Sequence, residues 1–168
     1  DEIRGWNRAT QAKRQPGSAI KPLSVYAPAI DTGKITEAAT VVDEEITIGS
    51  DNWKPKNSYN DFYGEMSIKE AVARSSNIPA VKILDMVGLN TSFGYLQNKF
   101  HFSTLSDKDK NYSSLSLGGL TNGVTVKEMA SAYSAFANEG KYIAPYTYTQ
   151  VLDSAGNVIL QNGENSSQ

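Results

Sequence analysis

The chain has 168 residues, about the length of one domain, and its 16 Lys and Arg residues nearly balance its 18 Asp and Glu residues. This near-neutral charge argues against nucleic acid as the main partner, because binding to phosphates requires an excess of cations. The absence of cysteine excludes disulfides and thiolate sites, and the single histidine, His101, disfavours a Ser-His-Asp triad, so any hydrolytic chemistry needs another base.

Hydrophobic spacing predicts one long helix near the start of the chain. Pro16-Gly17 marks a turn, and the helix is expected from Ser18 to about Ile30, with Pro22 tolerated in its first turn. The residues that share its apolar face are Ile20, Leu23, Ala27 and Ile30. Weak alternation then predicts a strand or extended chain over 40–48, and an aromatic-rich polar loop follows over 49–64.

Capping sequences predict four further helices. Ser-x-x-Glu and Thr-x-x-Glu capping boxes open helices over 67–74 and 125–140. A third helix is expected over 79–87, with Pro at its first position and Gly immediately after its end. Asn90 is expected to cap a fourth helix that reaches Lys99. In the helix over 125–140, the predicted apolar stripe consists of Met129, Ala132, Tyr133 and Phe136.

The C-terminal part has the pattern of a β-hairpin. Residues 146–152 and 158–161 read as its two strands, joined by a Gly-Asn turn. Residues 162–168 are polar and read as a linker or a cut end. With five predicted helices and strands mainly near its end, the chain as a whole, residues 1–168, is expected to be helix-rich.

The sharpest chemical motif is a serine and a lysine three residues apart. Ser18 lies at the mouth of the predicted first helix, and Lys21 lies about one turn further on the same face. A neutral lysine could act as the base for the serine, but half-neutrality at pH 7 requires its pKa to lie about 3.4 units below the ordinary value of ~10.4. The hypothesis therefore requires a desolvated Lys21. On spacing alone, a helix-capping serine and a solvated lysine are the more common explanation of the pattern.

A serine and lysine pair of this kind is accompanied by an S-x-N motif in the enzymes that use it. The chain contains three such sequences, which begin at Ser50, Ser58 and Ser75. We reject Ser50-Asp51-Asn52, although its letters match best, because no apolar element would hold that loop rigidly. Ser75-Ser76-Asn77 lies between two amphipathic helices and is preferred, with a simple helix cap as the alternative interpretation.

Several blocks in sequence order resemble a known family. Trp6–Pro22 is similar to the active-site block of class A, bifunctional penicillin-binding proteins, and Arg74–Val81 resembles their S-x-N block. Leu117–Leu120 and Glu128–Gly140 also match the pattern of the family. The resemblance implies the α/β (α+β) fold shared by penicillin-binding proteins and β-lactamases, and a serine DD-transpeptidase domain without metal or cofactor.

The resemblance also implies roles for individual residues. Ser18 corresponds to the acylated nucleophile and Lys21 to its general base, while Ser75 relays protons to the leaving amine. Asn77 corresponds to the residue that holds the lysine and binds the substrate amide, and Trp53 resembles a tryptophan at the rim of the cleft. The implied partners are the D-Ala-D-Ala stem peptides of peptidoglycan and β-lactam antibiotics, which acylate the same serine.

One family motif is absent from the 168 residues. No Lys-Thr-Gly or Lys-Ser-Gly occurs, and in the family this motif supplies a cation for the substrate carboxylate and, nearby, an oxyanion donor. We therefore expect residues 1–168 to be part of a transpeptidase domain, lacking most of the central antiparallel sheet. The rest is expected in a second chain or a missing C-terminal segment, and the fragment alone is expected to be inactive or nearly so.

Two other functions fit the same motifs. A DD-carboxypeptidase or β-lactamase would differ in using water for deacylation, and a non-catalytic β-lactam sensor would acylate without turnover. From the family, the parent protein is expected to be membrane-anchored at the outer face of the bacterial cell membrane.

Overall fold

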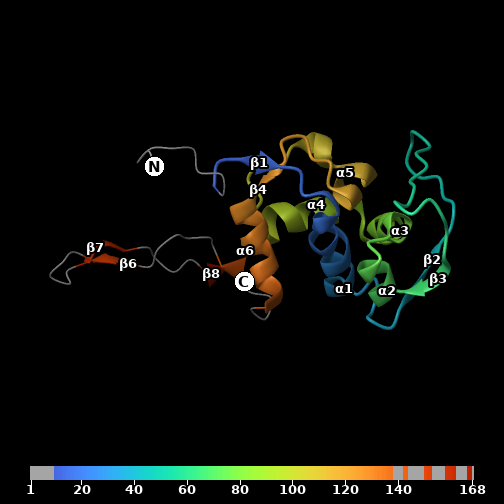
Figure 1. Ribbon diagram of the computed structural model, residues 1–168, viewed down its shortest axis with the longest axis horizontal. Coiled ribbons are helices and arrows are strands. Elements are labelled where there is room, and N and C mark those ends of the chain that lie inside the picture. The colour runs from blue at the N-terminus through green and yellow to red at the C-terminus, as the bar shows by residue number, and fades with distance from the viewer. Residues whose placement is uncertain (1–9, 138–141, 144–149, 153–157, 162–165, 168) are drawn as a thin grey trace. The chain divides into compact units, whose positions relative to one another are not determined.

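Helices dominate the computed structural model, which describes residues 10–137, 142–143, 150–152, 158–161 and 166–167 (Figure 1). The chain forms two units, Lys13–Val124 and the combination of Asp1–Ala12 with Thr125–Gln168. Within the described ranges, no helix is both long and apolar enough to cross a membrane.

The first helical segment is irregular. Where one helix was predicted, the structure has a 3₁₀ turn, η1 (Gly17–Ile20), a π-helix, η2 (Pro22–Tyr26), and a short α-helix, α1 (Ala27–Asp31). Pro22 has no N–H to donate to Ser18, so the chain closes a tighter turn through Lys21 and a wider one through Ala27, whose N–H donates to the carbonyl of Pro22.

This change of period also changes which side chains are buried. Ile20 and Leu23 are fully buried as predicted, but Ile30 is 46% exposed and does not continue the predicted face. The prediction assumed 3.6 residues per turn, whereas a π-turn contains more residues and rotates the following side chains around the helix axis. The segment stays buried through Val25, Pro28 and Ala29, so its buried face turns away from the predicted one.

A small antiparallel sheet follows. Strand β2 (Thr40–Asp43) pairs with β3 (Gly64–Ser67), with Thr40 opposite Ser67 and Asp43 opposite Gly64. The predicted strand continued to residue 48, but regular pairing ends at Asp43. Along β2, Val41 and Asp43 are buried while the alternate residues are exposed, so the sheet directs a carboxylate inwards.

Helices α2 (Ile68–Ala73) and α3 (Asn77–Val87) begin close to their predicted positions. The predicted Ser67 cap is confirmed, since its Oγ accepts the N–H of Glu70. Helix α3 starts two residues before Pro79, and it ends at Gly88, as predicted. The next helix, α4 (Leu89–Gly94), starts one residue before Asn90, so the predicted Asn90 cap is wrong; the π-helix η3 (Tyr95–Lys99) continues it.

Helix α3 lies at the centre of the Lys13–Val124 unit. It packs against η2, α1, α4 and α5 (Tyr112–Leu117), and against β2. The remaining elements of this part of the chain are η4 (Asp107–Asp109), β1 (Lys13–Arg14) and β4 (Val124–Thr125). The larger apolar side chains that are fully or almost fully buried include Ile20, Leu23, Val25, Ile78, Val81, Ile83, Leu84, Leu96 and Leu115.

The second unit contains α6 (Val126–Ala137), whose predicted Thr125 cap is confirmed because Oγ1 accepts the N–H of Glu128. Strands β6 (Gln150–Leu152) and β7 (Val158–Gln161) pair antiparallel and confirm the hairpin. Strand β5 (Tyr142–Ile143) pairs with β8 (Ser166–Ser167), which lies inside the segment predicted to be a linker. Residues 138–140 of the predicted helix and 146–149 of the predicted strand lie outside the described residues.

Candidate active site

Lys21 lies at the junction of η1 and η2, and its side chain is buried. The residue is 2% exposed, and its Nζ donates hydrogen bonds to the carbonyl oxygen of Ser75 at 2.7 Å, the Oγ of Ser75 at 3.2 Å and the Oδ1 of Asn77 at 2.7 Å. The fold therefore brings the lysine of the first motif onto the S-x-N sequence that was preferred, across more than fifty residues of chain.

Burial lowers the pKa of Lys21 from 10.5 to about 8. At pH 7 this makes about one lysine in ten neutral, compared with about one in 3,000 at the ordinary pKa of 10.5. The expectation of a desolvated lysine is confirmed. Three acceptors satisfy the three N–H groups of the charged amine; after deprotonation, the lone pair can accept a proton from a serine hydroxyl.

Ser75 occupies a left-handed backbone conformation, with φ at +52°. It follows the end of α2, where the N–H of Ser75 bonds to Val72 and the N–H of Ser76 bonds to Ala71. These two bonds form a Schellman motif, and Ser75 takes the position that usually requires glycine. The tight turn directs both the carbonyl and the hydroxyl of Ser75 to Lys21.

Asn77 is held from both sides. While its Oδ1 accepts from Lys21, its Nδ2 donates to the carbonyl of Lys56 at 2.8 Å, and its backbone N–H donates to the Oδ1 of Asn57 at 3.0 Å. A cation on one side and a carbonyl on the other orient the amide, because the oxygen must face the donor and the nitrogen the acceptor. Asn77 therefore presents a defined acceptor to the lysine.

Ser18 is exposed in the η1 turn, directly after Gly17. This turn is anchored by the 118–120 segment. A Cβ atom on Gly118 would lie 2.1 Å from the carbonyl oxygen of Gly17, so only glycine permits this approach. The side-chain amide of Gln15 also pairs with the backbone of Leu120, donating to its carbonyl at 2.6 Å and accepting from its N–H at 2.8 Å. The chain that leads into Ser18 is therefore anchored at two points, Gln15 and Gly17.

A buried lysine joined to an S-x-N turn, beside an anchored serine, agrees with the family comparison. The family model described as the penicillin binding protein transpeptidase domain matches residues 4–168. The chain belongs to this family. It is 37% identical to penicillin-binding protein 4 of Bacillus subtilis and 40% identical to penicillin-binding protein 1A of Clostridium botulinum strain Hall, over 97% of the chain in both cases.

The expected penicillin-binding protein fold is also confirmed by a solved structure. A crystal structure of penicillin-binding protein 1A from Haemophilus influenzae superposes with a TM-score of 0.82 and 29% identity over 99% of this chain. The chain spans 26% of the Bacillus relative, 21% of the Clostridium relative and 24% of the Haemophilus chain. It thus corresponds to about a quarter of the length of these penicillin-binding proteins.

Trp53 lies in a different environment from Lys21. It lines a pocket of about 580 Å³ together with Ser50, Asp51 and Tyr112. The rejected Ser50-Asp51-Asn52 sequence therefore contributes to the Trp53 pocket, and the hydrogen bonds of the Lys21 amine go to Ser75 and Asn77 instead. The assignment of Trp53 to a substrate cleft stays a prediction.

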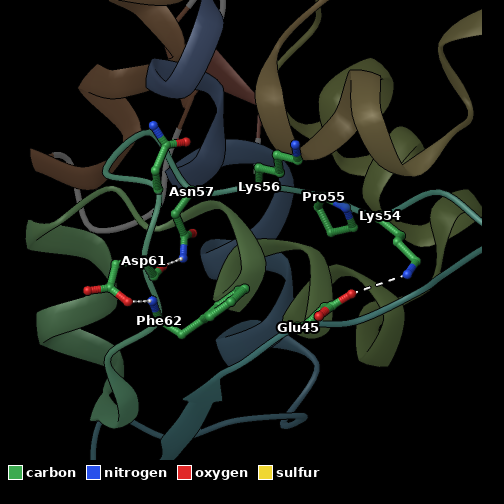
Figure 2. A pocket seen from close by; sticks show the side chains of 8 residues that line it. Glu45, Lys54, Pro55, Lys56, Asn57, Asp61 and Phe62 are labelled. Carbon is green, nitrogen blue, oxygen red and sulfur yellow. Dashed lines mark hydrogen bonds and ion pairs between the residues drawn. The ribbon is translucent and has the colours of Figure 1, made fainter.

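The sequence analysis did not identify two buried residues that support the Ser75–Asn77 turn through hydrogen bonds. Asp43 and Asn57 are almost completely buried; Asn57 accepts the backbone N–H of Asn77, and Asp43 accepts a hydrogen bond from Asn57. The alternation of Val41 and Asp43 on one face of β2 was a signal that could have marked the aspartate as inward-facing. Lys56 and Asn57 also line a pocket of about 380 Å³, beside the exposed ion pair of Lys54 and Glu45 (Figure 2).

A metal centre was not expected. In the part of the chain that the structure describes, no group of three or more His, Cys, Asp or Glu residues could hold a metal ion.

Proposed function

We propose that this chain is the part of a peptidoglycan DD-transpeptidase domain that carries the acylated serine. The observation that supports the proposal is the buried Lys21 amine, hydrogen-bonded to Ser75 and Asn77 and placed three residues after the exposed Ser18. Family membership supports the same conclusion. The substrates are D-Ala-D-Ala stem peptides, and β-lactams are inhibitory analogues.

Acylation begins when neutral Lys21 takes the proton of the Ser18 hydroxyl as its oxygen attacks the carbonyl carbon between the two D-Ala residues. The backbone N–H of Ser18 is one donor to the oxyanion that forms. When the C–N bond breaks, Ser75 passes a proton from Lys21 to the departing amine. The products are free D-Ala and an ester of Ser18, and Lys21 is again neutral.

Deacylation reverses these steps with a different amine. The amino group of a neighbouring stem peptide attacks the ester, its proton passes to Lys21, and Ser18 regains its own proton as the peptide cross-link forms. A β-lactam enters by the same route, but the amine released from its ring remains tethered to the acyl group. Because the amine cannot leave the site, the acyl-enzyme persists.

The proposed location of the parent protein follows from the substrate. Peptidoglycan lies outside the cell membrane, so the domain acts at the extracytoplasmic face, and we propose that a membrane anchor elsewhere in the parent holds it there. We also propose that a C-terminal part of the domain, in the same chain or another, supplies the Lys-Thr-Gly motif.

The test is covalent labelling of the full parent protein by a fluorescent penicillin. We expect stable labelling that Ser18→Ala abolishes and that Ser50→Ala leaves intact, since the Lys21 amine bonds to Ser75 and Asn77 and not to Ser50. Absence of labelling in the parent would contradict the assignment of Ser18. Labelling that depends on Ser50 would contradict the choice of S-x-N motif.

Turnover of a D-Ala-D-Ala peptide separates the transpeptidase from the other two functions. We expect release of D-Ala, and an added acceptor amine should capture the acyl group of the Ser18 ester as cross-linked product. Release with water as the sole acceptor would identify a carboxypeptidase, and labelling without any release would identify a sensor. Trp53→Leu tests the cleft assignment. If Trp53 lies at the rim of the cleft, its replacement should raise KM for the peptide and leave kcat unchanged.

A further inference from the structure

Asn57 uses its whole side chain to join two parts of the fold. It is 4% exposed; its Nδ2 donates to the Oδ1 of Asp43 at 2.7 Å and to the carbonyl of Asp61 at 3.0 Å. Its Oδ1 accepts the backbone N–H groups of Asn77 at 3.0 Å and of Ile78 at 3.2 Å. Figure 2 shows the Asn57 amide pointing towards Asp61, where the bond to the Asp61 carbonyl is drawn. Every donor and acceptor of this amide is therefore used.

The two N–H groups that Asn57 accepts belong to the first turn of α3. These groups have no partner within the helix and normally bond to the side chain of the N-cap residue. The N-cap of α3 is Ser76, but its side chain makes no capping bond; instead its Oγ is hydrogen-bonded to the hydroxyl oxygen of Tyr59 at 2.8 Å. Asn57 thus caps α3 from a distant loop.

Asp43 orients the cap. Its side chain is fully buried, and the carboxylate accepts from Asn57 through Oδ1 and from the Tyr59 hydroxyl and the Tyr63 N–H through Oδ2, at 2.8 and 3.1 Å. Because a carboxylate can only accept, it forces the amide nitrogen of Asn57 towards itself and the amide oxygen towards α3. A neutral residue in this place would not impose that direction.

We propose that Asn57, oriented by Asp43, is the positioning residue for the Ser75–Asn77 turn and, through it, for Lys21. The bonds run from Asp43 to Asn57, from Asn57 to the backbone of Asn77, and from the side chain of Asn77 to Lys21. The neighbouring residue, Lys56, holds the Asn77 side chain through its carbonyl. The inference rests on the proposed function in one respect: the activity that it predicts is acylation of Ser18.

The decisive experiment exchanges the two side chains in the full parent protein. Asn57→Asp places a carboxylate against Asp43, so the turn should shift; a displacement of about 1 Å in such a site costs roughly 10²-fold in rate. We expect the acylation rate constant for a fluorescent penicillin to fall by about that factor, with its non-covalent binding constant nearly unchanged. Asp43→Asn removes the directing carboxylate and should also slow acylation.

The double variant Asp43→Asn with Asn57→Asp restores complementarity. The new amide at 43 donates to the new carboxylate at 57, whose second oxygen still accepts the N–H groups of Asn77 and Ile78. We expect the acylation rate constant of the double variant to be at least about tenfold higher than that of Asn57→Asp. The effects of substitutions at two residues in contact are not additive. The exchange loses the bond to the Asp61 carbonyl and places a carboxylate oxygen of residue 57 against it, so recovery should be incomplete.

Two controls separate positioning from stability. Asn90→Asp makes the same chemical change at an exposed site on α4 and should leave acylation unchanged. Ile83→Val removes a methyl group from a core residue that is 1% exposed; it should lower the midpoint of thermal unfolding without changing the acylation rate constant. A loss of acylation in Ile83→Val equal to that in Asn57→Asp would reduce Asn57 to a stabilising residue and overturn the proposal.

The remaining outcomes are also decisive. Wild-type acylation in Asn57→Asp, or a double variant no better than Asn57→Asp, would overturn the proposal. If both single variants fail to fold, the double variant decides, because a folded and acylating protein requires the pairing. If the parent itself is not acylated, the proposed function fails, and recovery of the unfolding midpoint in the double variant still tests the pair.

Discussion

Ser75 combines an unfavourable backbone conformation with two acceptors for Lys21. Non-glycine residues rarely adopt positive φ, and the cost is about 1–2 kcal/mol. The Schellman bonds at the end of α2 hold the turn nonetheless. A glycine would fit the backbone better but would lack the hydroxyl that lies 3.2 Å from the Lys21 amine. At this position, stability and chemistry favour different residues.

Ser75→Gly is therefore expected to stabilise the fold and disable the site. Compared with Ser75→Ala, which loses the same hydroxyl but retains the strained φ, it should gain up to about 1 kcal/mol in the free energy of unfolding. Both variants should turn over D-Ala-D-Ala peptide much more slowly, since protonation of the leaving amine needs the hydroxyl. Thermal unfolding and D-Ala release are the measurements. Equal stability of the two variants would show that the turn carries no strain.

The lowered pKa of Lys21 predicts the pH dependence of acylation. Since the base must be neutral, the rate constant should rise about tenfold per pH unit below the pKa of about 8 and level off above it. Lys21→Arg should be inactive at every pH, because a guanidinium does not lose its proton in this range. Stopped-flow acylation by a penicillin, from about pH 6 to 10, measures the profile. A flat profile would exclude Lys21 as the base.

At the scale of elements, the η1 turn depends on its contact with the segment that follows α5. Gly118 has φ at +77° and lies directly against the backbone of Gly17, whose carbonyl oxygen a Cβ would approach to 2.1 Å. Because backbone atoms cannot yield as a flexible side chain does, any larger residue must move one of the two segments. Movement of the Gly17 segment would carry Ser18 with it.

Gly118→Ala should therefore slow acylation of Ser18 by about 10²-fold. The matched control is Gly33→Ala, at a turn with φ at +69° and no atom within 4 Å of the added Cβ. Both variants introduce the same backbone strain, about 1–3 kcal/mol, but only the first introduces a clash. Acylation rates and unfolding midpoints are compared. Similar acylation in both variants would mean that the close approach to Gly17 is not needed.

Elements that depend on local sequence were predicted well. The Ser67 and Thr125 caps are confirmed because a capping side chain bonds to an N–H only three residues away. The segment after Ser18 was predicted less well, since Pro22 shifts the hydrogen-bonding pattern to 3₁₀ and π turns. A periodicity of 3.6 could not foresee that Ile30 would face solvent.

At the scale of the whole molecule, the pairing of Lys21 with Ser75 and Asn77 could be anticipated only from motifs and their order. No local pattern predicts a contact across fifty-four or fifty-six residues. The Asp43 and Asn57 pair was not anticipated at all, because each residue is an ordinary loop or strand-end residue until the fold brings them to 2.7 Å. Burial of a carboxylate next to the Ser75–Asn77 turn is a tertiary property.

The number of oxyanion donors should limit how fast residues 1–168 alone are acylated. The proposed mechanism needs a second oxyanion donor besides the Ser18 N–H, and the Lys-Thr-Gly motif near which the family places it does not occur in this sequence. Removal of one oxyanion donor costs about 10²–10³ in rate. The polypeptide Asp1–Gln168 alone should therefore be acylated by penicillin at least about 10²-fold more slowly than a protein extended through that motif.

The comparison uses time-resolved labelling of the two proteins, with Ser18→Ala in each as the blank. Addition of the C-terminal part as a separate polypeptide should raise the labelling rate of Asp1–Gln168 if the two associate into one domain. Labelling of the shorter protein at the rate of the longer one would show that Ser18, Lys21, Ser75 and Asn77 suffice for acylation, and that the second donor lies within these residues.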